Sequence, residues 1–224
     1  REQHRQAAVV RARRVGAHQH GHQVGAGGVG DPGLVAGHQV IVPLADGAGA
    51  NLWSTAELVN NDLSVKRMPV VGLLDTRSAR HKVTDSAAGA GAYATGERIT
   101  NRTISVAASC PFPSSNTPPT TPWPDGCDPL ESWFRIARDG GKATGLVTTT
   151  DVVDATPASF VAHSPSRYWG DTIAAQTAEF GLDVLLGGGR RHFAGAERAD
   201  GRDLYGAMCA RSQCVTNAQE LGAY

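Results

Sequence analysis

A serine at the start of a predicted helix is the residue of this sequence best placed to do chemistry. Ser86 follows Asp85 and precedes a run of small residues, 87–95, that Gly96 closes. Unpaired N–H groups and the positive end of the helix dipole gather at such a position, which suits an anion beside a hydroxyl group. Asp and Ser are also the commonest helix N-caps. The pattern predicts a helix over 87–95 and leaves Ser86 as either a cap or a nucleophile.

Oxygen-bearing side chains follow a second predicted element, the strand at 143–150. Asp151, Asp154 and Thr156 are hard oxygen ligands of the kind that Mg²⁺ prefers. The alternative is a polar loop in which Thr156 precedes a proline that opens a helix, Pro157. The segment is therefore a candidate magnesium site or an ordinary loop before a helix.

Two more side chains stand beside predicted elements. Asp46 follows the apolar run 39–45, and Arg167 comes just after a predicted helix. A guanidinium group binds phosphate through two parallel hydrogen bonds, so Arg167 is a candidate phosphate ligand. The alternative for Arg167 is an ordinary surface arginine.

The elements that position these residues alternate from residue 39 onward. Short apolar runs that end at turn residues predict extended segments, at 39–45, 69–74, 143–150 and 183–187. Helical spacing predicts the remaining helices, at 51–61, 129–138, 157–163 and 172–180. Strands separated by helices indicate an α/β fold with a largely parallel central sheet flanked by helices. Ligands of such sheets bind beyond the carboxyl ends of strands, where Asp46 and 151–156 stand.

Four segments taken together resemble the alkaline phosphatase family. They are the nucleophile signature VTDSAAGA at 83–90, the ADGAG loop at 45–49, the segment 154–167 and the strand and turn VLLGGGRRHF at 184–193. The resemblance covers about residues 39–221, and the motifs stand in the family's order. It implies an alkaline-phosphatase-like fold and the hydrolysis of phosphate monoesters.

The resemblance also implies a centre of two Zn²⁺ ions and one Mg²⁺ ion. Asp46 matches the carboxylate shared between one zinc and the magnesium, and Ser86 matches a serine that a zinc activates. Thr156 matches a magnesium ligand, and Asp154 matches the group that holds a magnesium-bound water. These four residues are the metal ligands that the resemblance implies.

On the substrate side, Ser86 matches the nucleophile that becomes phosphoserine and is then hydrolysed. Arg167 matches the guanidinium that grips the phosphate, and Asp85 matches the residue that orients it. Small phosphomonoesters are the implied substrates, and a homodimer is the implied assembly by analogy alone. A net charge of zero excludes nucleic acid as the main partner, since that function requires a basic excess.

The sequence departs from the family pattern in two respects. Gly91 stands where the signature has Thr, and the family's remaining ligands, several His, two Asp and a Glu, have no counterpart here. A catalytic zinc needs three protein ligands, which this sequence does not supply. We therefore expect an inactive N-terminal fragment, domain 39–224, of a phosphatase. The alternative is a non-catalytic domain that binds phosphate.

Residues 1–38 differ in composition from the rest. They carry five Arg against two acidic residues and no aromatic residue, which leaves a net charge of −3 on 39–224. The segment is expected to be disordered, as a flexible basic tail, or not native coding sequence. It contains the dinucleotide-type motif GAGGVG at 25–30 and alternating histidines at 18–22, but no strand and helix flank the motif, so neither is expected to be a site.

Four cysteines indicate the compartment. Six prolines lie in the loop that Cys110 and Cys127 bracket, so this segment predicts a surface loop closed by a disulfide. Of the three possible pairings, the local one, 110–127 with 209–214, is expected. Disulfides favour a periplasmic or secreted location, and no apolar stretch is long enough for a membrane span. Asn101-Arg102-Thr103 is a glycosylation sequon, which is uninformative for a bacterial protein.

Overall fold

The computed structural model describes residues 7–10, 40–70, 72–112 and 122–223. The chain divides into two units, one formed by Arg14–Lys66 and the other by Arg1–Arg13 with Arg67–Tyr224. The motif at 25–30 and the histidines at 18–22 lie outside the described residues.

The smaller unit contains one regular α-helix among its described residues. Helix α1 (Ala50–Val59) confirms the prediction at 51–61, and the 3-10 helix η1 (Ser64–Arg67) follows it. Lys66 Nζ lies 2.6 Å from Glu57 Oε1 and links the two. The strand predicted at 39–45 is wrong, because residues 40–45 are irregular and exposed. A strand needs a hydrogen-bonded neighbour, and the described residues offer this run none.

The larger unit contains a sheet in which two strands confirm the prediction. Strands β2 (Gly145–Asp151) and β3 (Val184–Gly188) pair in parallel, with α4 and α5 between them in the chain. Strand β1 (Ala7–Val10) pairs antiparallel with β3, and β4 (Gln213–Val215) pairs antiparallel with β1, in the order β2-β3-β1-β4. The predicted α/β fold class is confirmed. The described residues of the predicted extended run 69–74 form no strand, since they have no pairing partner there.

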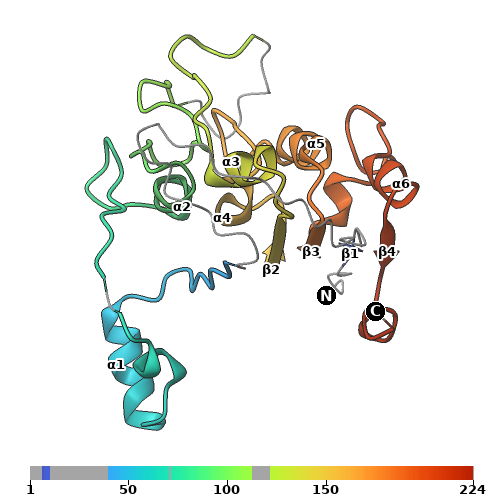
Figure 1. Ribbon diagram of the computed structural model, residues 1–224. Helices are drawn as coiled ribbons and strands as arrows, with labels where there is room; N and C mark the ends of the chain where they lie inside the picture. Colours follow the sequence, from blue (N-terminus) through green and yellow to red (C-terminus); the bar gives the residue numbers. More distant parts are fainter. Residues whose placement is uncertain (1–6, 11–39, 71, 113–121, 224) are drawn as a thin grey trace, which may run out of the picture. The chain divides into compact units, whose positions relative to one another are not determined.

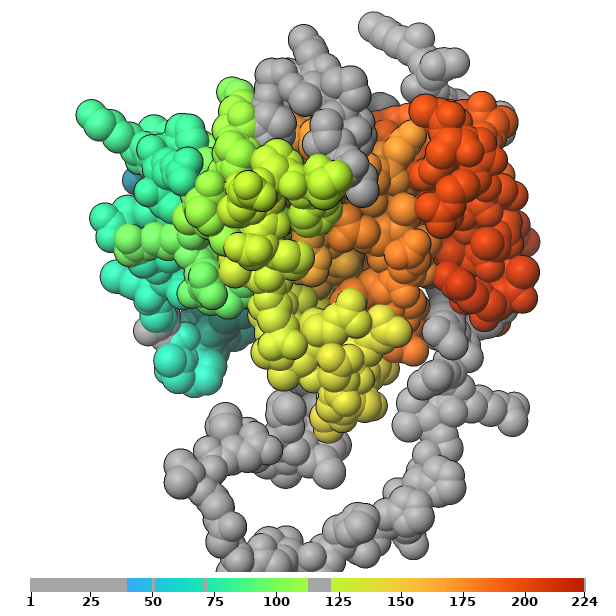
Figure 2. Space-filling model, turned by 90° about the horizontal axis from the view of Figure 1, so that it is seen from above, coloured from blue at the N-terminus to red at the C-terminus, as the bar shows by residue number. Residues whose placement is uncertain are grey.

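Helices of this unit pack beside the parallel pair (Figure 1). Helix α3 (Trp133–Asp139) and helix α5 (Gly170–Phe180) lie within the predicted ranges or within two residues of them. Helix α4 (Ala155–Ala158) is one turn long and starts before the predicted 157–163. The remaining elements are η2 (Arg190–His192), α6 (Leu204–Cys209) and α7 (Ala218–Leu221). Seen from above, the green, yellow, orange and red segments follow one another across the unit (Figure 2).

The core joins the helices to the sheet. Phe134 and Phe160 have ring centroids 5.1 Å apart, and Trp133 stacks edge-on against both. Ile173 of α5 and Leu185 of β3 belong to the same buried cluster. Burying each such side chain contributes about 1.5–3 kcal/mol to stability, so this cluster is the main support of the elements around the site.

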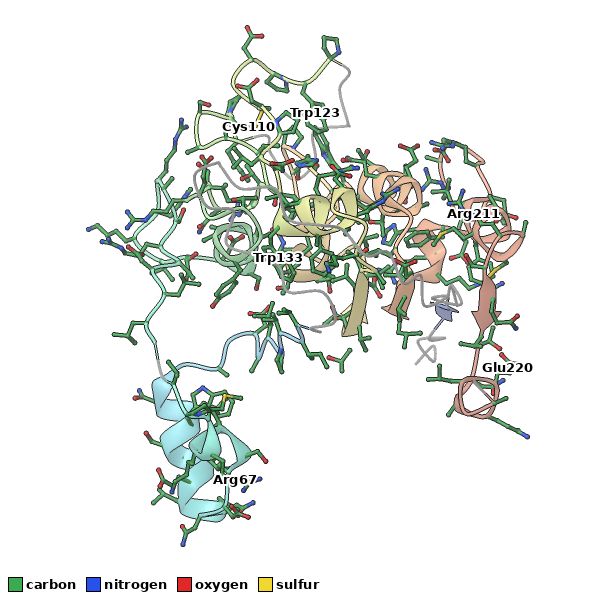
Figure 3. All side chains as sticks on the ribbon, in the orientation of Figure 1. Arg67, Cys110, Trp123, Trp133, Arg211 and Glu220 are labelled. Atoms are coloured by element: carbon green, nitrogen blue, oxygen red, sulfur yellow. A yellow bond between two sulfur atoms is a disulfide. The ribbon has the colours of Figure 1, made fainter. Side chains whose placement is uncertain are left out.

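Both expected disulfides are present. Cys110 bonds to Cys127 and Cys209 bonds to Cys214, which confirms the local pairing. Cys110, Cys127 and Val106 form a small apolar cluster against which Trp123 packs, in the loop at the upper edge of Figure 3. The centre of the proline-rich loop, 113–121, lies outside the described residues. Among the described helices, none is both long and apolar enough to cross a membrane.

Candidate functional site

The nucleophile candidate opens helix α2 (Ser86–Thr95). Asp85, not Ser86, is the N-cap, because its side chain accepts a hydrogen bond from the N–H of Ala88 at 2.9 Å. Gly96 ends the helix in the left-handed conformation at φ 76°. Ser86 is half-buried, and its hydroxyl makes no hydrogen bond within the described part of the chain. The hydroxyl group is therefore not used for capping, and the helix dipole favours an anion beside it.

Asp85 connects the start of α2 to the candidate phosphate ligand. Its Oδ1 caps the helix, while its Oδ2 accepts from the Arg102 N–H at 3.0 Å and from Arg167 Nη1 at 3.3 Å. The side chains of Asp85 and Arg167 are each 24% exposed, so solvent only partly screens their attraction. The structure thus brings Arg167 next to the residue that precedes Ser86.

The segment that carries Arg167 is held on both sides. Ile104 and Ser164 exchange two backbone hydrogen bonds, at 2.8 and 2.9 Å. The Arg167 N–H donates to the Arg102 carbonyl at 2.7 Å, and the buried Ser164 hydroxyl donates to the Ser166 carbonyl at 2.7 Å. These hydrogen bonds hold the backbone of Arg167 in place and so limit the positions that its guanidinium group can reach.

The candidate magnesium ligands lie on the helix that packs against α2. Helix α4 contacts α2, and Asp154 is the residue before its first turn. The Asp154 carboxylate is exposed and makes no capping hydrogen bond, whereas Thr156 is half-buried within the helix. Asp154 and Thr156 stand two residues apart, and each carries a hard oxygen donor of the kind that Mg²⁺ prefers.

Asp46 belongs to the other unit. It lies in a turn that the Ala48 N–H closes on the Ala45 carbonyl at 3.2 Å, with Gly47 at φ 74°. Asp46 lies in the smaller unit, whereas Ser86, Asp154 and Thr156 lie in the larger one. Its predicted role as a shared metal ligand stays a prediction.

Asp151, the first oxygen-bearing side chain of the segment 151–156, has an ion-pair partner. It forms an ion pair with Arg191 at the end of β2, and Gly188 and Gly189 pack against it so closely that a Cβ at either would touch its side chain. The sequence grouped Asp151 with Asp154 and Thr156. The ion pair with a residue 40 positions away was not visible from that spacing.

Two histidines of the larger unit, His163 and His192, contact other residues through their imidazole rings. His163 Nε2 lies 2.9 Å from the Leu130 carbonyl, and burial lowers the pKa of this imidazole. His192 Nδ1 lies 2.8 Å from Asp171 Oδ1. Among the described residues, no group of three His, Cys, Asp or Glu side chains forms a metal site. Asp154 and Thr156 thus offer oxygen donors that Mg²⁺ accepts, and the described residues do not complete the ligand set of a zinc ion.

Sequence reasoning missed two residues that contact the site. Asn101 bonds to the backbone of Val83 and Asp85, and Arg102 bonds to Asp85 and Arg167 through its own backbone. The sequence marks Asn101 only as part of a sequon. The position of its partners, 16 and 18 residues earlier, carries no local signal.

The chain is similar to known phosphatases over most of its length. Residues 39–223 match a family model described as Alkaline phosphatase. Repressible alkaline phosphatase of Saccharomyces cerevisiae is 36% identical over 82% of this chain and 32% of the relative. Streptomycin-6-phosphate phosphatase of Streptomyces griseus is 33% identical over 72% of this chain and 38% of the relative. The chain thus spans about a third of the length of the curated relatives it matches.

Solved structures show the same likeness. Alkaline phosphatase from the Antarctic bacterium TAB5 superposes with a TM-score of 0.60 at 30% identity, over 74% of this chain and 43% of that chain. A mutant of the same enzyme, with a TM-score of 0.60 and 31% identity over the same shares, is described with magnesium bound. Alkaline phosphatase from Thermus thermophilus has a TM-score of 0.51 at 40% identity, over 62% of this chain and 26% of that chain.

Proposed function

Because this chain belongs to the alkaline phosphatase family, we propose that the protein containing it hydrolyses phosphate monoesters through a phosphoserine at Ser86. The observation that carries the proposal is the divided carboxylate of Asp85. One oxygen caps the helix that Ser86 opens, and the other binds Arg167. Asp85 thereby holds the guanidinium group of Arg167, the candidate phosphate ligand, close to the N-terminal end of helix α2.

In the first step, the Ser86 oxygen attacks phosphorus as the bond from phosphorus to the ester oxygen breaks. The Ser86 hydroxyl gives its proton to solvent in this step, and the alkoxide takes up a proton from water and leaves as the alcohol. The guanidinium group of Arg167 holds two nonbridging oxygens, and the N-terminal end of α2 favours their negative charge. Water then attacks the phosphoserine, which releases phosphate and restores the Ser86 hydroxyl.

The proposal includes zinc and magnesium. Thr156 would hold magnesium, Asp154 would hold a water bound to it, and Asp46 would be the carboxylate shared between magnesium and one zinc, as the family resemblance implies. When bound, such ions lower the pKa of the serine hydroxyl and stabilise the leaving oxygen. No step above is assigned to zinc, because the described residues do not complete its ligand set.

The kinetic test replaces the nucleophile. In the complete phosphatase that contains this chain, Ser86→Ala is expected to lower kcat/KM for p-nitrophenyl phosphate at least about a thousandfold. Chelation is expected to abolish activity, and Zn²⁺ with Mg²⁺ to restore it. Ser54→Ala, in the other unit, is the matched control and should hydrolyse the ester at the parental rate. Full activity of Ser86→Ala would exclude this serine as the nucleophile.

A second candidate is a non-catalytic phosphate-binding domain, favoured by the incomplete zinc ligands among the described residues. Calorimetry distinguishes it. Two results together support this candidate. The 224-residue chain binds phosphate and loses that binding in Arg167→Ala, and the complete protein shows no hydrolysis. Absence of binding to the chain excludes it.

We also propose a periplasmic or secreted location and small phosphomonoester substrates. The two disulfides support the location, because such bonds persist in oxidising compartments. A homodimer remains part of the proposal by family analogy, and light scattering on the complete protein tests it.

A further inference from the structure

One side chain joins both sides of the loop that leads to Ser86. Asn101 Nδ2 donates to the Val83 carbonyl at 2.9 Å, and Asn101 Oδ1 accepts from the Asp85 N–H at 3.3 Å. An amide offers a donor and an acceptor on one planar group, whereas an ionised carboxylate only accepts, so Asp cannot replace both bonds and Ala replaces neither. The backbone on each side of Thr84 is thus fixed by a residue outside the motif.

The next residue extends this attachment to the phosphate ligand. The Arg102 N–H donates to Asp85 Oδ2 at 3.0 Å, and the Arg102 carbonyl accepts from the Arg167 N–H at 2.7 Å. Arg102 has φ 68°, a left-handed conformation that is unfavourable for a residue other than glycine. Surrounding contacts must hold it there, and the fully buried Thr103 does so by donating to the Thr100 carbonyl at 2.7 Å.

We propose that Asn101 and Arg102 form a positioning clamp for phosphoryl transfer. Asn101 sets the backbone of Val83 and Asp85, and Arg102 connects the Asp85 carboxylate to the backbone of Arg167. The two residues thereby fix the distance between the Ser86 hydroxyl and the guanidinium group without touching substrate. The clamp rests on the proposed function for its effect on turnover, but its effect on phosphate binding does not depend on turnover.

The test uses the complete phosphatase with Asn101→Ala and the isosteric Asn101→Asp. Because displacement of reacting groups by a fraction of an ångström lowers the rate steeply, we expect kcat to fall at least about tenfold in both. We expect the dissociation constant of inorganic phosphate, measured by calorimetry, to rise about tenfold, because Arg167 loses its fixed position. Asn101→Asp retains the shape of the side chain and serves if Asn101→Ala does not fold.

The control is Asn217→Ala. Asn217 makes a comparable pair of side-chain hydrogen bonds, to Glu220, at the start of helix α7. We expect it to lower the melting temperature with kcat and the phosphate constant within about twofold of the parent. If the Asn101 variants lose stability like Asn217→Ala but keep kcat and phosphate affinity, the clamp is wrong. If Ser86→Ala stays active, the proposed function fails, and phosphate affinity alone then decides the clamp.

Discussion

At the scale of single residues, Asp85 caps helix α2 and leaves the Ser86 hydroxyl without a capping role. Asp and Ser compete for the cap position, and Asp85 takes it through the Ala88 N–H. The Ser86 hydroxyl therefore remains available at the positive end of the helix. The same carboxylate binds Arg167, so one side chain both ends the capping ambiguity and orients the candidate phosphate ligand.

Also at this scale, His163 should make stability depend on pH. Burial lowers its pKa below the usual 6.5, so the folded state prefers the neutral imidazole. As the pH falls, the unfolded state therefore binds more protons than the folded state. The free energy of unfolding that His163 contributes is complete above about pH 6.5 and is lost as the pH falls through the lowered pKa. Urea unfolding at pH 7.5 and 5.5 should show a smaller loss of unfolding free energy in His163→Gln than in the parent. Equal losses in His163→Gln and the exposed control His81→Gln would contradict this.

At the scale of elements, the sequence predicts features whose causes are local. Helix α2 has its cap, its small residues and its terminating Gly96 within twelve positions, and it was predicted correctly. The strand predicted at 39–45 is wrong, because strand pairing depends on neighbouring segments that the spacing of apolar residues does not specify. Asn101 was missed for a similar reason, since its function depends on backbone groups of a distant loop.

Gly91, the departure from the family signature, has a steric explanation in the element. A Cβ at Gly91 would lie 2.3 Å from Ile99 Cδ1, whereas one at Gly89 would lie 4.0 Å from its nearest neighbour. Replacing glycine by alanine in a helix contributes up to about 1 kcal/mol, but overpacking costs about 1–3 kcal/mol. Gly91→Ala should therefore lower the unfolding free energy in urea, and the control Gly89→Ala should raise it.

The clash also predicts coupling between the two positions. In an Ile99→Ala background the space is free, so Gly91→Ala should become neutral or stabilising. An unchanged penalty in that background would show that Ile99 is not the cause.

At the scale of the whole molecule, the residues that the family resemblance assigns to the centre divide between the two units. Asp46 lies in Arg14–Lys66, while Ser86, Asp154, Thr156 and Arg167 lie in the larger unit. The chain covers about a third of its curated relatives. The candidate nucleophile Ser86 and the candidate phosphate ligand Arg167 thus lie within one unit, and the candidate shared metal ligand Asp46 lies in the other.

The most direct test of the account is detection of the covalent intermediate. The protein is mixed with excess phosphomonoester, quenched in acid and digested, and the peptide containing Ser86 is analysed by mass spectrometry. We predict one added phosphate on Ser86. The phosphorylated fraction should fall after dilution into substrate-free buffer, and it should be lower in Arg167→Ala than in the parent. An active enzyme whose Ser86 peptide never carries phosphate, or one that is phosphorylated at another residue, would contradict the account.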